Sequence, residues 1–210
     1  MKAVILAGGK GTRLGNLALD LPKPLVKICD TPILEHQIRL LKREGITDII
    51  LLTGHLGHKI QDYFGGGEKF GVQIQCIQEE APLGTAGCLT ALKGKIQEDF
   101  LLLYGDVILD MDFGLLAQFH QKKGAFATLV AHPNDHPYDS DLIKSNDNEE
   151  ITGFFLKKEH KGKDCDNLVN AAIYVLSSSI FDYIPSQECD FIQDIFPKVL
   201  QDGKPLYAYQ

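Results

Sequence analysis

Lys2-Ala-Val-Ile-Leu-Ala7, followed by Gly8-Gly9-Lys10-Gly11-Thr12-Arg13-Leu14, is the stretch around which the rest of the chain is interpreted. Its first half is a short apolar run, typical of a strand buried on both faces of a parallel sheet. The three glycines that follow lack Cβ atoms, so their backbone N–H groups can approach a bound anion closely. Arg13 adds a planar cation that matches phosphate oxygens. The stretch therefore predicts a phosphate-binding loop at the carboxyl end of the first strand.

The two common nucleotide-binding glycine motifs do not match this loop. In a Rossmann fingerprint that begins at Gly9 and Gly11, Leu14 stands where the third glycine belongs. A Walker A loop requires Gly-x-x-x-x-Gly-Lys-Ser/Thr, and the sequence contains no such run. The alternative interpretation is a tight turn between a strand and a helix, in which the glycines serve packing alone.

A stiff segment, Leu21-Pro22-Lys23-Pro24-Leu25, follows shortly afterwards. Two prolines around one lysine restrict the backbone, so Lys23 is held in place and suits a phosphate as a point charge. The alternative is an ordinary solvated lysine in a turn. Together, the segments 7–14 and 21–25 resemble the signature of the sugar-phosphate nucleotidyltransferases, also called nucleoside-diphosphate-sugar pyrophosphorylases. The resemblance implies an α/β fold: a Rossmann-like, three-layer α/β/α arrangement with a mostly parallel mixed sheet.

Composition narrows the class of protein. The 210 residues suffice for one α/β domain, and the net charge of −7 argues against a general nucleic-acid surface. No apolar run approaches the ~20 residues of a membrane span, and no signal peptide precedes the first strand. The five cysteines are widely spaced without a Cys-x-x-Cys pair, so we expect reduced thiols rather than a zinc site or a disulfide framework. We therefore expect a cytoplasmic protein that contacts neither nucleic acid nor membrane.

Strand and helix patterns alternate in the first half of the chain, which predicts a mostly parallel sheet covered on both faces. We expect a single nucleotidyltransferase domain in which residues 1–126 bind the nucleotide and residues 127–210 bind the sugar. Strands are expected over 3–7, 48–53, 72–78, 100–104, 127–131, 142–145, 151–156, 168–176 and 206–209. Helices are expected over 33–44, 57–64, 85–92, 113–122, 178–184 and 191–200.

Apolar spacing also predicts which side chains of two helices are buried. Leu34, Ile38 and Leu41 recur at helical spacing in the first long helix. In the helix expected over 113–122, Leu115, Leu116 and Phe119 are expected to face inward.

Asp106 is the predicted metal ligand. It follows an apolar strand and a glycine, so its carboxylate should stand at the strand's carboxyl end beside the phosphate-binding loop. Magnesium is commonly held by one or two carboxylates together with phosphate oxygens and water. In the family pattern, Gly105-Asp106 corresponds to the metal-binding aspartate, which implies Mg²⁺ as cofactor. The alternative is a simple turn aspartate.

A second nucleotide-binding stretch is predicted over residues 78–87. The family resemblance implies that Pro-Leu-Gly-Thr-Ala-Gly, beginning at Pro82, contacts the base; the alternative is a plain transition from loop to helix. Glu79 or Glu80 could accept hydrogen bonds from guanine N1–H and N2–H₂, which uracil and thymine do not offer, so GTP is favoured. The predicted nucleotide-binding residues are Leu6, Ala7, Gly8, Gly9, Gly11, Thr12, Gln78, Glu79, Pro82, Gly84 and Thr85.

The second half resembles the sugar-binding part of the family. Asn170-Ala-Ala-Ile-Tyr-Val-Leu176 is similar to the family's Asn-Ala-Gly-Ile-Tyr-Val-Leu strand, with Ala172 at the usual glycine. The resemblance implies that Asn170 binds sugar hydroxyl groups. In Gly153-Phe-Phe-Leu-Lys157, Leu156 replaces a glutamate that often binds the sugar, whereas Lys157 keeps the lysine.

A further departure concerns the kind of sugar. Tyr138-Asp-Ser-Asp-Leu-Ile143 replaces the family's usual Tyr-Gly-Val-Val and resembles proteins assigned to heptose 1-phosphate guanylyltransfer. Asp141 is the residue of this segment that could bind a sugar hydroxyl group. Heptose 1-phosphate is therefore favoured over a common hexose 1-phosphate.

The implied reaction is an in-line attack of a sugar 1-phosphate on the α-phosphorus of a nucleoside triphosphate, which releases pyrophosphate. The attacking oxygen is already anionic, so catalysis rests on positioning and charge neutralisation. Arg13 is assigned to the leaving pyrophosphate, Lys23 to the phosphates around the reacting centre and Asp106 to Mg²⁺.

Other readings stay open from the sequence. The product could be a UDP-, dTDP- or GDP-hexose, or the chain could be a non-catalytic nucleotide-sugar sensor or regulatory subunit. A cofactor guanylyltransferase is a further alternative, although Pro22-Lys23-Pro24 fits sugar enzymes better. The family usually continues beyond the position of Tyr209 with a second metal-binding aspartate, so we expect that segment to be lacking, with a homo-oligomer or a fusion to another sugar-pathway domain left open.

Overall fold

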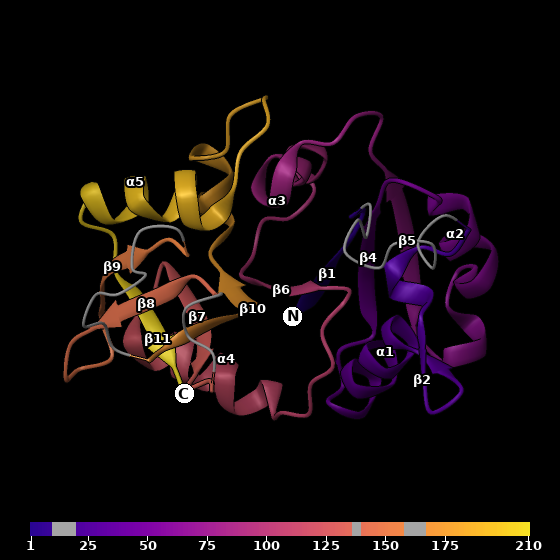
Figure 1. Cartoon of the computed structure of the whole chain (residues 1–210), viewed down its shortest axis with the longest axis horizontal. Coiled ribbons are helices and arrows are strands. Elements are labelled where there is room, and N and C mark those ends of the chain that lie inside the picture. The colour runs from indigo at the N-terminus through magenta and orange to yellow at the C-terminus, as the bar shows by residue number, and fades with distance from the viewer. Residues whose placement is uncertain (10–19, 136–139, 158–166) are drawn as a thin grey trace. The chain divides into compact units, whose positions relative to one another are not determined.

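The structure is a computed structural model (Figure 1), and it describes residues 1–9, 20–135, 140–157 and 167–210. The predictions for Gly11, Thr12 and Arg13 lie outside the described residues.

The chain divides into two compact units. The first unit comprises Met1–Leu83 and Phe100–Gly114, and the second comprises Gly84–Asp99 and Leu115–Gln210. The assignment of residues 1–126 to nucleotide binding and of residues 127–210 to sugar binding stays a prediction.

The first unit is built on parallel strands in the order β6-β1-β4-β5. Their bounds are Phe100–Tyr104 for β6, Lys2–Ala7 for β1, Asp48–Thr53 for β4 and Gln73–Gln78 for β5. Ala3, Val4 and Ile5 of β1 are completely buried, as are most residues of its neighbours. The continuous apolar runs thus form the interior of a sheet that is covered on both faces, as predicted.

Helices connect these strands because parallel strands require crossover connections. They are α1 (Ile33–Arg43) and α2 (Gly57–Phe64), drawn in purple in Figure 1. Leu34, Ile38 and Leu41 of α1 are fully buried, which confirms the predicted inward face. Shorter elements of this unit are the 3₁₀ helices Lys23–Leu25 and Glu68–Phe70 and the paired strands β2 (Lys27–Ile28) and β3 (Thr31–Pro32).

The second unit has a mixed sheet. Strand β10 is antiparallel to both β7 and β8, β8 is antiparallel to β9, and β11 is parallel to β7. The bounds are Ala127–His132 for β7, Leu142–Ser145 for β8, Ile151–Phe155 for β9, Val169–Leu176 for β10 and Leu206–Tyr209 for β11. The bounds of β8 and β11 are those predicted from the sequence.

Apart from α4 (Phe113–Lys123), whose residues from Leu115 onward belong to it, the second unit has helices that are short or irregular. They are α3 (Gly84–Gly87), the 3₁₀ helices Cys88–Leu92 and Ser178–Asp182, a π-helical turn Phe191–Ile195 and α5 (Phe196–Gln201). The ring of the fully buried Tyr174 packs against those of Phe191 and Phe196, with centroid distances of 5.6 and 5.3 Å. These aromatic contacts attach the segment 191–201 to β10.

Of the three residues predicted to face inward on helix α4, Leu116 is buried as predicted, Phe119 is half-buried and Leu115 is exposed, so the prediction for Leu115 is wrong. In α4 (Phe113–Lys123), Leu115 is 52% exposed, whereas Leu116 and His120 are buried. The buried face contains His120, whose polar ring is accommodated because its Nδ1 lies 2.9 Å from the Thr128 hydroxyl oxygen. Leu115 lies about 100° around the helix from Leu116, so burying residue 116 leaves residue 115 facing solvent.

Candidate active site

Asp106 and Lys23 meet at the carboxyl ends of β1 and β6. The backbone N–H of Gly105 donates a 2.9 Å hydrogen bond to the carbonyl of Leu6, so the residues after β6 lie beside the end of β1. Lys23 Nζ donates to Asp106 Oδ2 and forms an ion pair with it. Pro22 is extended and Pro24 lies in the first turn of the 3₁₀ helix that Lys23 begins, which restricts this backbone as expected. The structure thus brings together a cation and a carboxylate that lie 83 residues apart in sequence.

Glycines allow three strand ends to approach one another closely. Gly8 follows β1, Gly54 follows β4 and Glu79 follows β5. A Cβ atom on Gly54 would lie 2.8 Å from the carbonyl oxygen of Gly8, and a Cβ atom on Gly8 would lie 2.6 Å from Glu79 Oε2. Side chains at either glycine would therefore force the strand ends or the Glu79 carboxylate to move. The Glu79 N–H also donates a 2.7 Å hydrogen bond to the Thr53 carbonyl, which fixes the start of this loop.

The Glu79 carboxylate is held in an unusual environment. Its Oε1 atom is buried and has no hydrogen-bond partner among the described residues. Burial raises the pKa of the Glu79 carboxyl above its ordinary value, because the charged form loses hydration. A buried carboxylate oxygen without a donor is costly unless a ligand supplies one. The neighbouring predicted residues Gln78 and Pro82 are exposed.

Gly84 and Thr85 belong to the second unit, where they are attached to the segment 189–191. Gly84 has a positive φ of 75°, and a Cβ atom there would lie 2.4 Å from the Cys189 carbonyl oxygen. The Thr85 hydroxyl donates a 2.6 Å hydrogen bond to Asp190 Oδ2 and accepts one from the Phe191 N–H. Sequence reasoning missed Asp190, because no local motif links it to Thr85.

The predicted sugar-binding residues also come together in the second unit. Asp141 Oδ1 accepts a 2.9 Å hydrogen bond from the Lys157 backbone N–H, and the Asp141 carbonyl accepts one from the Asn170 N–H at 3.2 Å. The side-chain amide of Asn170 donates to the Tyr174 hydroxyl at 2.7 Å. The three residues thus lie at the adjoining ends of β8, β9 and β10, although their role in binding a sugar stays a prediction.

Ala172 occupies a strained backbone position in β10. Its φ is +59°, in the left-handed region, where the strand pairing with β7 is irregular. An L residue there costs roughly 1–2 kcal/mol, whereas glycine adopts the conformation without that strain. The positive φ therefore explains why the family usually has glycine at this position.

We expect Ala172→Gly to stabilise the protein. The relief of strain exceeds the extra chain entropy of glycine, so the free energy of unfolding should rise by about 0.5–1 kcal/mol. Urea denaturation measures the change. Ala171→Gly is the control, because Ala171 has no positive φ and its replacement should destabilise the strand. Destabilisation by Ala172→Gly as large as that of the control would contradict the prediction.

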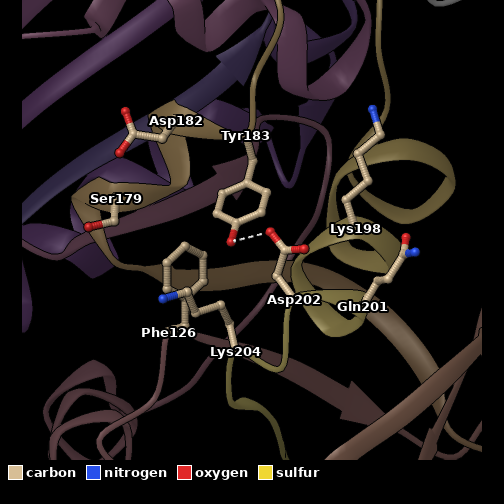
Figure 2. A pocket seen from close by; sticks show the side chains of 8 residues that line it. All are labelled: Phe126, Ser179, Asp182, Tyr183, Lys198, Gln201, Asp202 and Lys204. Carbon is tan, nitrogen blue, oxygen red and sulfur yellow. Dashed lines mark hydrogen bonds between the residues drawn. The ribbon is translucent and has the colours of Figure 1, made fainter.

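A separate cavity of about 640 Å³ lies in the second unit (Figure 2). The hydroxyl of Tyr183 donates a 3.0 Å hydrogen bond to Asp202 Oδ2 within it. Lysines and aspartates line it in equal number, and none of the predicted site residues does. Its lining residues are Phe126, Ser179, Asp182, Tyr183, Lys198, Gln201, Asp202 and Lys204. With balanced charges and no buried polar group pointing to a ligand, this cavity is a weaker candidate than the strand ends of the first unit.

Across residues 1–9, 20–135, 140–157 and 167–210, no helix is both long and apolar enough to cross a membrane. The same ranges contain no group of three or more His, Cys, Asp or Glu side chains that could hold a metal ion by themselves.

Comparison with solved structures defines the class of fold. The chain matches a Bacillus anthracis protein, solved in complex with sucrose and assigned to the glucose-1-phosphate thymidylyltransferases, with a TM-score of 0.87 and 24% identity. The match covers 100% of this chain and 86% of that one. The predicted α/β fold, with a mixed and mostly parallel sheet and helices, is thereby confirmed.

The chain belongs to the nucleotidyl transferase family, whose family model matches residues 2–210. It is 35% identical over 227 residues to the UTP–glucose-1-phosphate uridylyltransferase of Synechocystis sp., covering 99% of this chain and 57% of that protein. It is 37% identical over 219 residues to the mannose-1-phosphate guanyltransferase of Candida albicans, covering 100% and 58% respectively. The chain thus spans somewhat more than half the length of these relatives.

Proposed function

We propose that this protein transfers a nucleotidyl group from a nucleoside triphosphate to a sugar 1-phosphate, forming a nucleoside-diphosphate sugar and releasing pyrophosphate. GTP is the favoured donor and heptose 1-phosphate the favoured acceptor, with the product used in the synthesis of surface glycans. The observation that carries the proposal is the ion pair between Lys23 and Asp106 beside the end of β1. A cation and a carboxylate at the edge where parallel α/β sheets bind nucleotides support a role for Lys23 on phosphate and for Asp106 on a metal.

The chemistry requires charge neutralisation more than proton transfer. An anionic oxygen of the sugar 1-phosphate forms a bond to the α-phosphorus, and the bond from that phosphorus to the β-phosphate oxygen breaks, so pyrophosphate leaves with the electron pair. Arg13 is assigned to the leaving pyrophosphate and Lys23 to the phosphates around the reacting centre. Both roles are electrostatic and need no change of protonation at either side chain.

Asp106 fits a magnesium site in which the protein supplies a carboxylate and the substrate phosphates supply further oxygen ligands. Its side chain is 34% exposed, so a ligand can reach the carboxylate, and a carboxylate oxygen is the donor that Mg²⁺ prefers. When bound, Mg²⁺ supplies charge neutralisation on the phosphates. Lys23 pairs with Asp106 and so compensates the charge of its carboxylate. Lys23 would leave this ion pair for a phosphate when a metal-bound triphosphate enters the site.

Glu79 supports guanine as the base. Its buried oxygen lacks a donor among the described residues and its second oxygen lies against Gly8. Guanine offers the adjacent donors N1–H and N2–H₂, which one carboxylate can accept together. Uracil and thymine offer no such pair, so binding them would leave part of the carboxylate unsatisfied.

Fewer observations bear on the identity of the sugar 1-phosphate than on that of the base. Asp141, Lys157 and Asn170 adjoin one another, and Leu156 replaces the glutamate usual for the family. A hexose 1-phosphate is the second candidate, because the relatives described above are named for glucose 1-phosphate and mannose 1-phosphate.

Release of pyrophosphate across a matrix of triphosphates and sugar 1-phosphates tests the proposal. The matrix should contain GTP, UTP, dTTP and ATP against heptose, mannose and glucose 1-phosphates. We expect turnover with GTP and heptose 1-phosphate to exceed that of every other pair. Highest turnover with a hexose 1-phosphate would support the second candidate. Nucleotide-sugar binding without turnover of any pair would overturn the proposal in favour of a sensor or regulatory subunit.

A further inference from the structure

The side chain of Gln37 is a polar group buried in the apolar face of α1. It is 2% exposed and lies on the face that contains Leu34, Ile38 and Leu41. Its Nε2 atom donates two hydrogen bonds, to the carbonyl of Tyr104 at 2.8 Å and to the carbonyl of Val107 at 2.6 Å.

These two carbonyls bracket the Gly105–Asp106 pair. The Val107 N–H donates to the Tyr104 carbonyl at 3.3 Å and so closes a four-residue turn with Asp106 inside it. One amide group therefore holds both ends of the turn that carries the candidate metal ligand. The Gly105 N–H, bound to the Leu6 carbonyl, fixes the same turn to β1.

The orientation of the Gln37 amide follows from its partners. Both partners are carbonyl oxygens, so only the NH₂ end of the amide can face them. The Oε1 atom is then left buried without a hydrogen-bond partner among the described residues. An apolar side chain of similar size would avoid that cost and preserve the packing of α1. The benefit of glutamine at this position must therefore lie in the two bonds to the turn.

We infer that Gln37 is a positioning residue, which holds the Gly105–Asp106 turn so that the Asp106 carboxylate stays beside Lys23 and the end of β1. Its effect on metal-dependent turnover rests on the function proposed above. Its effect on the turn itself does not, because Gln37 bonds directly to the backbone carbonyls of the turn.

Hydrogen exchange of the turn tests the positioning role directly. In Gln37→Leu, the Val107 N–H should exchange about tenfold faster, because two hydrogen bonds that hold the turn are lost. The backbone amides of β4 should exchange in the same order of rates as in the wild type. Glu35→Gln is the matched control: Glu35 is also buried on α1, but it accepts from Arg39 and Tyr63 and does not touch the turn. Exchange of the Val107 N–H at the wild-type rate in Gln37→Leu would overturn the inference.

Magnesium titration tests the consequence for catalysis. In Gln37→Leu, the half-saturating Mg²⁺ concentration should rise about tenfold, as when the support of a metal ligand is removed. The KM for the sugar 1-phosphate should change less than twofold, and Glu35→Gln should keep the wild-type Mg²⁺ requirement. An unchanged requirement in Gln37→Leu contradicts the catalytic part of the inference.

Two further outcomes are covered by this design. Should Gln37→Leu fail to fold, Gln37→Asn keeps the amide but shortens it by one methylene, and we expect the same changes with smaller size. Should wild-type protein turn over no substrate pair, the proposed function fails, while hydrogen exchange still decides whether Gln37 holds the turn.

Discussion

Asp106→Asn should lower kcat by about 10²–10³-fold, the size of effect seen when one preorganised electrostatic contact to the transition state is removed. Asparagine keeps the shape of the side chain and removes the negative charge that would hold Mg²⁺. The half-saturating Mg²⁺ concentration should rise as well, because the carboxylate is the ligand assigned to the metal. Steady-state release of pyrophosphate at varied Mg²⁺ measures both changes.

Loss of folding should not account for this effect. The side chains of Lys23 and Asp106 are 31% and 34% exposed, and an ion pair this accessible to water stabilises a fold by roughly 0–1 kcal/mol. The expected catalytic loss corresponds to about 3–4 kcal/mol, which is clearly larger. Asp110→Asn is the matched control, because Asp110 is 81% exposed and pairs with Arg43 outside the site. Equal activity of the Asp106 and Asp110 variants would remove Asp106 from the mechanism.

Lys23→Met should show a loss of similar size with a different signature. The Mg²⁺ requirement should stay near that of the wild type, whereas turnover falls because a phosphate loses its cation. In the double variant Lys23→Met/Asp106→Asn, the losses in turnover of the two single variants should not add. The reason is that the two side chains act on one charge distribution.

Glu79→Gln should reduce kcat/KM for GTP about 10²-fold relative to UTP, because a pair of guanine donors would lose its carboxylate acceptor. A glutamine amide can accept one of the two donors but would set its own NH₂ group against the other. Comparing kcat/KM for the two triphosphates at saturating sugar 1-phosphate measures the change in preference. Glu80→Gln is the control, because Glu80 is the adjacent carboxylate and is exposed. An unchanged preference in Glu79→Gln would eliminate Glu79 as the group that selects the base.

The pH dependence of Glu79 has a defined sign. Burial raises the pKa of its carboxyl, so the folded protein binds this proton more tightly than the unfolded chain does. Its contribution to the free energy of unfolding therefore falls as the pH rises from the ordinary glutamate pKa through the raised one. Affinity for GTP should change in the opposite direction, because guanine donors prefer the ionised carboxylate. Calorimetric titrations with GTP over this pH range should show that affinity rises with pH for the wild type. The rise should be absent in Glu79→Gln.

Sequence patterns were sufficient for the strands of the main sheet, although they did not predict the short paired strands β2 and β3. The apolar runs of β1, β4 and β6 identify buried parallel strands, because only such strands are continuously apolar on both faces. Since the carboxyl ends of parallel strands lie along one edge, the sequence alone predicts that Gly8 and Asp106 lie near each other. The backbone bond from Gly105 to Leu6 and the Lys23–Asp106 pair show that this neighbourhood exists.

The roles of other residues depend on contacts that no local pattern records. Gln37 interrupts an apolar helix face and could have been noticed, but only the fold shows that its amide meets the two carbonyls around Asp106. The exposure of Leu115 likewise reflects which side of α4 the rest of the protein covers.

By itself, then, the sequence determined the strands of the main sheet and the charged residues offered at the strand ends, because backbone preference and apolar periodicity are local properties. Tertiary structure alone decided that one oxygen of the Glu79 carboxylate is buried while the other lies beside Gly8, and that Gln37 bonds to both ends of the Asp106 turn. Both depend on the register and packing of segments far apart in the chain. Those are set by the balance of many weak contacts rather than by any short motif.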